Sequence, residues 1–194
     1  MLIALLTALF FLIADQATKY LVVSNMTLGQ TIPVIEGALY WHYARNSGAA
    51  FSMLTGFQWL FMIASASATV AIIIYLARTK TPIHWVGKLA LGLIMAGALG
   101  NLFDRLMHAN HEVIDFIYVN IPAIKFDFAI FNVADSCVTV GAILLCSYIL
   151  FKHEKYVKKV KGLASGEQPA EQAAEPVVEG TQTPEGHDGE QAPL

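Results

Sequence analysis

The chain alternates four long apolar runs with polar connections. The runs cover about residues 1–23, 57–77, 86–103 and 128–151, and each is long enough to cross the hydrocarbon core of a bilayer as a helix. The first run has no basic segment ahead of it and three more runs follow, so we interpret it as a span and not as a cleaved signal peptide. The pattern predicts an all-α membrane protein with four transmembrane helices.

The polar connections contain a second kind of pattern. Residues 39–43 and 113–119 are rich in β-branched and aromatic side chains, which favour extended strands and membrane interfaces. A turn of small residues, which includes Gly48, follows the first of these segments. We therefore predict a small extended β platform within 24–56, on the membrane surface, and an outer loop over 104–127. A surface loop without a special role is the alternative for 24–56.

Composition and charge agree with a membrane protein and divide the chain in two. Of the residues, 56% are hydrophobic and 14% are charged, which is too apolar for an ordinary soluble domain. Residues 1–161 carry all 12 Lys and Arg against 8 acids, whereas residues 162–194 carry 7 acids and no Lys or Arg. We predict one transmembrane domain over 1–161 and a disordered acidic cytoplasmic tail over 162–194. No basic stripe with interleaved aromatics is present, so no nucleic acid partner is expected.

The positive-inside rule orients the spans. Residues 78–88 and 152–161 together hold eight Lys or Arg, whereas the other two connections hold three. Basic residues accumulate on the cytoplasmic side, so both termini are expected there. This orientation places the rare polar residues of the spans and loops together at the outer face.

Those rare polar residues fall into three groups. Asp15 and Lys19 are four residues apart near the end of the first run, in the order that favours an ion pair. Lys19 would then either snorkel from a structural pair or anchor a lipid headgroup or backbone near a site. At the end of the third run, Asn101, Asp104 and Arg105 share one helix face, and Asp104 with Arg105 is expected to form a structural pair.

The third run also carries a stripe of small residues that includes Gly92, Ala96 and Gly100. This stripe is expected to pack against another helix.

The third group lies in the last run. Asp135 is about two turns from the start of that run, and Asn132 is one turn before it on the same face. An ionisable side chain inside a membrane span is costly and is a functional-site hypothesis by default. The run of residues 113–119 adds Asp115, which by its sequence surroundings alone could be a solvated loop acid.

Two acids that converge can activate water. Repulsion separates their apparent pKa values, so that one proton is held between them, and the pair can act as base and acid together. No metal-binding spacing such as C-x-x-C or H-E-x-x-H occurs, so no metal and no other cofactor is expected. A proton-coupled transporter and a metal-dependent lipid phosphotransferase remain as alternatives.

Five short motifs, in this order, resemble the lipoprotein signal peptidases (bacterial signal peptidase II). They are Asp15-Gln16-x-x-Lys19, Asn46-x-Gly48-x-Ala50-Phe51, Gly100-Asn101-x-x-Asp104-Arg105, Val113-x-Asp115-Phe116 and Phe131-Asn132-x-Ala134-Asp135-Ser136. The resemblance covers about residues 15–151. It implies an aspartyl endopeptidase of the bacterial inner membrane that removes the signal peptide from prolipoproteins, cutting before a cysteine that carries diacylglycerol.

The resemblance also implies roles for individual residues. The catalytic dyad would be Asp115 and Asp135. Residues that contact the substrate would be Asn46, Asn101, Arg105, Asn132, Lys19 and Asp15, and structural residues would be Asp104, Gly48 and Gly100. The expected partners are lipid-modified prolipoproteins and membrane phospholipids, and the protein is expected to be a monomer.

Overall fold

Four long helices form the body of the protein. The computed structural model describes residues 1–48, 57–108, 110–151 and 153–165. Its long helices are α1 (Leu2–Asn25), α2 (Gln58–Arg78), α3 (Trp85–Met107) and α4 (Val133–Phe151). Each is long and apolar enough to cross a membrane, which confirms the four predicted spans. Large apolar side chains cover their outer surfaces, for example Phe10, Ile63 and Ile143, as expected for helices in contact with lipid.

Two of the predicted boundaries are wrong. Helix α3 continues past residue 103, where the predicted span ends, to Met107, so Asp104 and Arg105 lie in its last turn. Helix α4 begins at Val133 and not at residue 128, because the segment before it takes part in strand contacts: Phe131 forms a bridge with Ile117 of β3. Asp135 is consequently in the first turn of α4, where the prediction placed it two turns deep.

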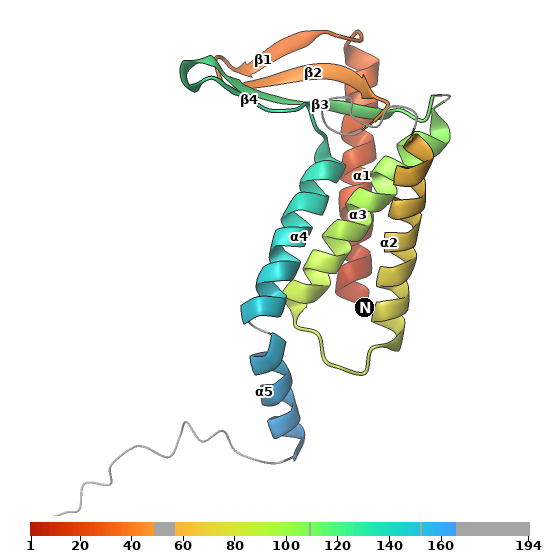
Figure 1. The fold of residues 1–194 in the computed structure, drawn as a ribbon, viewed down its shortest axis with the longest axis vertical. Coiled ribbons are helices and arrows are strands. Elements are labelled where there is room, and N and C mark those ends of the chain that lie inside the picture. The colour runs from red at the N-terminus through yellow and green to blue at the C-terminus, as the bar shows by residue number, and fades with distance from the viewer. Residues whose placement is uncertain (49–56, 109, 152, 166–194) are drawn as a thin grey trace, which may run out of the picture.

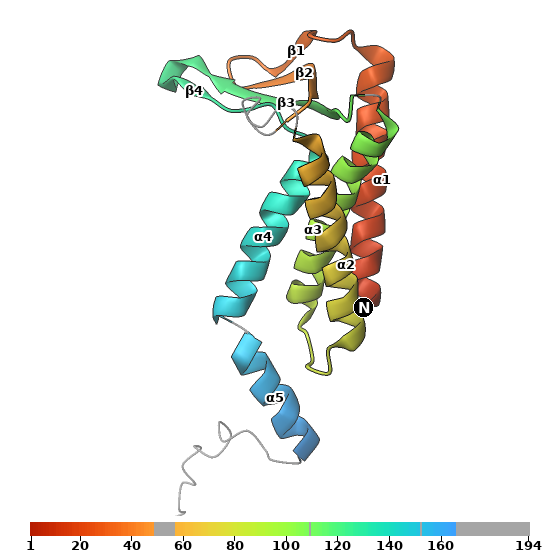
Figure 2. The same ribbon diagram turned by 45° about the vertical axis from the view of Figure 1, so that its right-hand side comes forward.

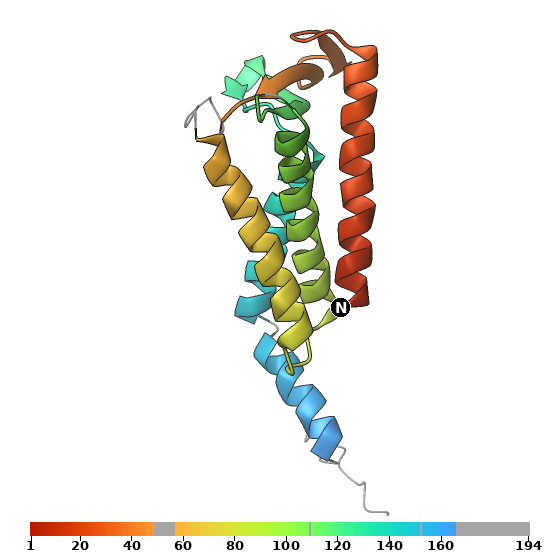
Figure 3. The same ribbon diagram turned by 90° about the vertical axis from the view of Figure 1, so that its right-hand side faces the viewer.

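Helix α3 is central and contacts each of the other three long helices. Figure 3 shows it between α1 and α2. The small-residue stripe allows this packing: a Cβ on Gly92 would meet Ala4 and Thr7, and a Cβ on Gly100 would meet the carboxylate of Asp15. Those contacts all lie on α1, and they confirm the predicted packing face.

Gly97, outside the predicted stripe, brings α3 and α4 together. A Cβ there would collide with the backbone carbonyl of Ala134 and the side chain of Val138. We expect Gly97→Val to destabilise the protein by about 1–3 kcal/mol, because backbone atoms cannot move aside as a flexible side chain can. The measurement is the melting temperature of the purified protein in detergent. Ala66→Val, on the exposed face of α2, is the control, and equal melting temperatures for the two variants would contradict this account of the helix contact.

A four-stranded antiparallel sheet lies at one end of the helices (Figure 1). Its strands are β1 (Thr31–Ile35), β2 (Leu39–Asn46), β3 (Val113–Ile121) and β4 (Phe126–Asp127), in the order β1-β2-β3-β4, with a short 3₁₀ helix η2 (Pro122–Ile124) between the last two. The platform is confirmed, but 24–56 supplies only half of it. The other half comes from the predicted outer loop.

The N-terminus lies at the opposite end of the helices from the sheet. Figure 1 and Figure 2 show Met1 there, and a further helix, α5 (His153–Ser165), continues beyond α4 at the same end. The helix extends past Gly162, where the predicted tail begins, so disorder does not start at that residue. The rest of the tail, 166–194, lies outside the described residues.

Candidate active site

The start of α4 positions the first acid. The side chain of Asn132 accepts a hydrogen bond from the backbone N–H of Asp135 at 2.9 Å, and the carboxylate of Asp135 accepts one from the backbone N–H of Asn132 at 3.2 Å. This reciprocal pair is a capping box, which satisfies free N–H groups at a helix start. The cap holds the Asp135 carboxylate at the helix start, where it remains partly exposed.

Strand pairing positions the second acid. Asp115 lies opposite Ala44 in the β2–β3 ladder, and Asn46 lies two positions further along β2. The side-chain amide of Asn46 donates to Asp115 Oδ2 at 2.9 Å, and that of Asn132 donates to Asp115 Oδ1 at 2.7 Å. Asp115 is only 2% exposed.

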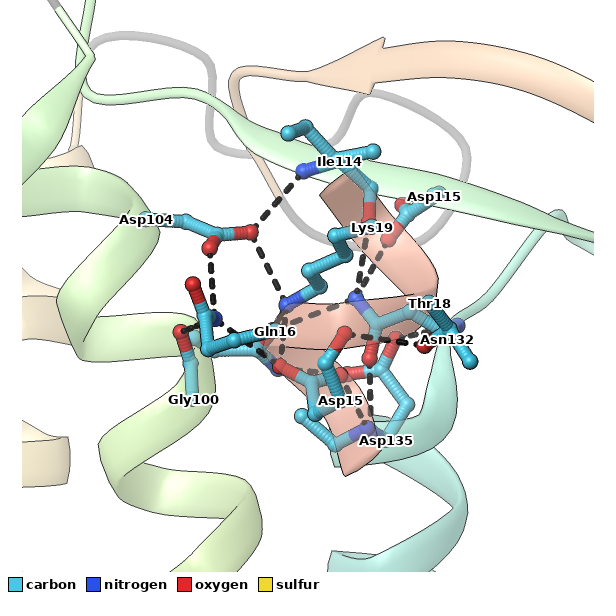
Figure 4. Close-up of polar contacts among 12 residues, drawn as sticks. Asp15, Gln16, Thr18, Lys19, Gly100, Asp104, Ile114, Asp115, Asn132 and Asp135 are labelled. Carbon is cyan, nitrogen blue, oxygen red and sulfur yellow. Dashed lines mark hydrogen bonds and ion pairs between the residues drawn. The ribbon is translucent and has the colours of Figure 1, made fainter. Parts of the chain in front are cut away.

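Two asparagines join the acids into one network. Asn132 Nδ2 also donates to Asn101 Oδ1 at 3.1 Å, and Asn101 Nδ2 donates to Asp135 Oδ1 at 2.7 Å. All four carboxylate oxygens of Asp115 and Asp135 thus accept an N–H bond. The structure brings together α3, α4, β2 and β3 at this point, as Figure 4 shows for Asp115, Asn132 and Asp135.

Beneath the network lies a fully buried ion cluster. Lys19 Nζ is 2.8 Å from Asp15 Oδ2, 2.9 Å from Asp104 Oδ2 and 3.3 Å from Asn101 Oδ1. The predicted pair of Asp15 and Lys19 is confirmed, but snorkelling is wrong, because Lys19 is 2% exposed. The predicted pairing of Asp104 with Arg105 is also wrong: within the described part of the chain, Asp104 forms its ion pair with Lys19.

The two acids of this cluster hold the backbone beside the dyad. Asp15 Oδ1 accepts the N–H of Ala134, the residue before Asp135, at 2.9 Å. Asp104 Oδ2 accepts the N–H of Ile114, the residue before Asp115, at 3.1 Å. One lysine therefore fixes α4 and β3 relative to each other through two carboxylates (Figure 4).

Two further polar residues lie near the network and the cluster: Gln16 contacts the ion cluster, and Arg105 contacts the backbone of Asn101. Gln16, which the site prediction omitted, donates to Asp15, Asp104 and the carbonyl of Gly100. The sequence signalled it in two ways: it is an amide inside an apolar run, and it stands in the first of the five motifs. Arg105 is 7% exposed, donates to the carbonyl of Asn101 at 3.2 Å and lies 5.2 Å from the ring centre of Phe61. Its Nε has no hydrogen-bond partner among the described residues.

Gly48 and Gly100, which we predicted to be structural residues, each help to position a polar side chain nearby. The N–H of Gly48 donates to the side chain of Asn46 at 2.9 Å, which orients the amide that contacts Asp115. Gly100 allows Asp15 to approach α3. Ala50 and Phe51 of the same motif lie outside the described residues. The catalytic and substrate-contacting roles stay predictions.

The surroundings of Asp115 favour its protonated form. Burial, together with the charge of the nearby Asp135, raises the pKa of Asp115 from its ordinary 3.8 to about 7, although the hydrogen bonds from Asn46 and Asn132 act to lower it. Asp115 therefore retains its proton at pH values where an exposed aspartate has lost it. Among the described residues, no group of three or more His, Cys, Asp and Glu is arranged to hold a metal ion.

Comparisons with known proteins agree with this geometry. The family model described as signal peptidase (SPase) II matches residues 7–151. A lipoprotein signal peptidase of Bacillus velezensis is 45% identical over 77% of this chain and 95% of its own length, and one of Bacillus subtilis is 41% identical over 78% and 96%.

The fold of this chain is also similar to that of solved membrane enzymes. A bacterial membrane enzyme at 32% identity superimposes with a TM-score of 0.66, covering 90% of this chain and 93% of that one. A second, at 36% identity, gives a TM-score of 0.67 over 77% and 93%. By sequence, by fold and by extent, the chain belongs to the signal peptidase II family, whose peptidases remove signal peptides from prolipoproteins.

Proposed function

We propose that this peptidase is of the aspartic type, with Asp115 and Asp135 as its catalytic dyad, and that it cuts before a diacylglyceryl-modified cysteine. The main support is the convergence of these two acids, from β3 and α4, on the shared amides of Asn101 and Asn132. One acid is buried and has a raised pKa, and the other is partly exposed and accepts two N–H bonds. Such a difference between environments separates the acid from the base in a dyad.

In the proposed reaction, the carboxylate of Asp135 takes a proton from water while the water oxygen attacks the scissile carbonyl. The carboxyl of Asp115 donates a hydrogen bond to the carbonyl oxygen and stabilises its developing charge. The C–N bond then breaks, and the leaving nitrogen receives a proton from the dyad. Asn101 and Asn132 hold the two carboxyl groups at a fixed orientation throughout.

We propose that Arg105 and Asn46 contact the substrate. Arg105 Nε is a buried donor without a partner among the described residues, and a peptide carbonyl would satisfy it. Asn46 lies at the end of β2 beside Asp115, so a substrate near the dyad would pass this strand end. Asp15 and Lys19 are enclosed by α3 and α4, and we propose that they act on the dyad and not on the substrate.

We propose further that the sheet end lies at the outer face of the bacterial cytoplasmic membrane, with both termini in the cytoplasm. The N-terminus and α5 are both at the end opposite the sheet (Figure 1). The basic residues of 78–88 and of α5 are at that end too, where the positive-inside rule places the cytoplasm. The dyad, at the sheet end, would then meet a lipid-anchored substrate near the outer interface.

The test measures cleavage of a diacylglyceryl-modified prolipoprotein from pH 5 to 9, with and without EDTA. The reaction needs the proton on Asp115, whose pKa is raised, so that proton is present below about pH 7 and is lost as the pH rises through it. We expect kcat/KM to fall above about pH 7, towards tenfold per pH unit, and to be unchanged by EDTA. The carboxylate oxygens already accept N–H donors, which a cation could not replace without breaking the network.

A rise in activity through pH 7 to 9 would contradict the assignment of the proton to Asp115. Loss of activity in EDTA that added Mg²⁺ restores would instead favour metal-dependent chemistry, as in the phosphotransferase alternative.

A further inference from the structure

Helix α5 lies beyond the region that the family model matches, yet it contacts the helical domain. The ring of Tyr156 packs edge-on against His84, with 5.0 Å between ring centres, and His84 stacks on Tyr148 of α4 at 6.4 Å. The backbone N–H of His84 donates to the hydroxyl of Tyr148 at 3.2 Å. These aromatic contacts hold α5 beside the connection between α2 and α3.

This contact brings basic residues from distant parts of the sequence to one end of the protein. We call this set the basic end: Arg78, Lys80, Lys88, Lys155, Lys158 and Lys159. All but Lys88 are exposed, and Lys88 is half-buried. Among the side chains that the structure describes, none of the six takes part in an ion pair. Five of these six side chains are exposed, so their charge can reach an external anion.

These residues lie at the ends of the membrane helices or just beyond them, where lipid headgroups are expected. Arg78 is the last residue of α2, and Lys88 is in the first turn of α3. Lys155, Lys158 and Lys159 follow the end of α4 by four to eight residues, which is about 6–12 Å along a helix. That distance is close to one Debye length at physiological salt, so the field of a charged membrane surface reaches all three.

We propose that the basic end binds acidic phospholipid headgroups of the leaflet that it adjoins, with α5 held in place by Tyr156. Clusters of Lys and Arg directly beyond a membrane span are attracted to anionic lipid surfaces. The sequence holds one other concentrated source of negative charge, the seven acids of 166–194, and the experiment below distinguishes it from lipid. The inference does not depend on the peptidase mechanism.

The experiment counts retained lipid. Full-length protein is purified from mixed micelles of detergent with equal phosphatidylglycerol and phosphatidylcholine, and both lipids are quantified per protein by mass spectrometry. We expect wild type to retain phosphatidylglycerol at least threefold over phosphatidylcholine, and Lys155→Gln/Lys158→Gln/Lys159→Gln to lose most of that preference. Lys125→Gln, an equally exposed lysine at the sheet end, is the matched control and keeps it. Each variant should cleave prolipoprotein at the wild-type rate.

A second variant tests the role of the aromatic contact. Tyr156→Ala keeps every charge but removes the ring that holds α5 to His84, so its preference for phosphatidylglycerol should fall at least twofold. Equal retention of phosphatidylglycerol by wild type and the triple variant would overturn the proposal. A second result would also overturn it: wild type shows no preference for phosphatidylglycerol, but a preference appears when the seven acids of 166–194 are replaced by their amides. That result would mean that the tail occupies the basic end.

Discussion

Asp135→Asn is expected to reduce prolipoprotein cleavage by at least about a thousandfold while the protein remains folded. An amide of the same shape can still accept one of the two N–H bonds that Asp135 accepts, but it cannot take a proton from water. General acid–base groups contribute about 10²–10⁴ in rate, and the two acids act as one unit, so loss of either should remove most of the catalysis. The mobility shift of a diacylglyceryl-modified prolipoprotein on a gel measures the cleavage.

Asp115→Asn is expected to have a similar effect on cleavage. Both oxygens of Asp115 accept amide N–H bonds, so this variant, like Asp135→Asn, places two donors face to face, and a modest loss of stability should accompany the loss of activity in each. Asp127→Asn is the matched control, since Asp127 is an exposed acid of β4 on the same sheet and should retain full activity. Substantial cleavage by a folded Asp135→Asn protein would remove Asp135 from the chemistry.

Lys19→Met is expected to destabilise the protein by about 3–5 kcal/mol or to prevent its accumulation in the membrane. The substitution leaves Asp15 and Asp104 buried without their cation, and breaking one side of a buried ion pair carries a cost of this size. Because these two acids hold the N–H groups of Ala134 and Ile114, the positions of both dyad residues should also loosen. Protein yield and melting temperature measure the first effect, and kcat measures the second.

A double variant separates this role from substrate contact. Lys19→Met with Asp104→Asn removes one charge of each sign, so it should recover part of the stability that Lys19→Met loses, even though Asp104→Asn alone is also destabilising. Lys125→Met, an exposed site, should change nothing measurable. A Lys19→Met protein of normal stability and normal kcat but raised KM would contradict the structural role and favour the substrate contact that the resemblance implies.

The sequence by itself determined the features that depend on residues close together along the chain. The length of the apolar runs predicted four membrane helices, and helical spacing predicted the ion pair of Asp15 and Lys19 and the packing face of Gly92 and Gly100. These features involve residues within a few turns of one another, or the contrast between lipid and water along one segment. Motif resemblance then supplied Asp115, which its own surroundings in the sequence did not distinguish.

Only the tertiary structure decided which segments meet. The pairing of β2 with β3 puts Asn46 beside Asp115, 69 residues away, and Lys19 forms its second ion pair across helices with Asp104 and not with a neighbour in sequence. Gly97 and Gln16 likewise acquire their importance from α4 and α3. Periodicity reports which face of an element a residue occupies, but the partner across that face depends on strand register and helix approach, which the whole packed domain determines.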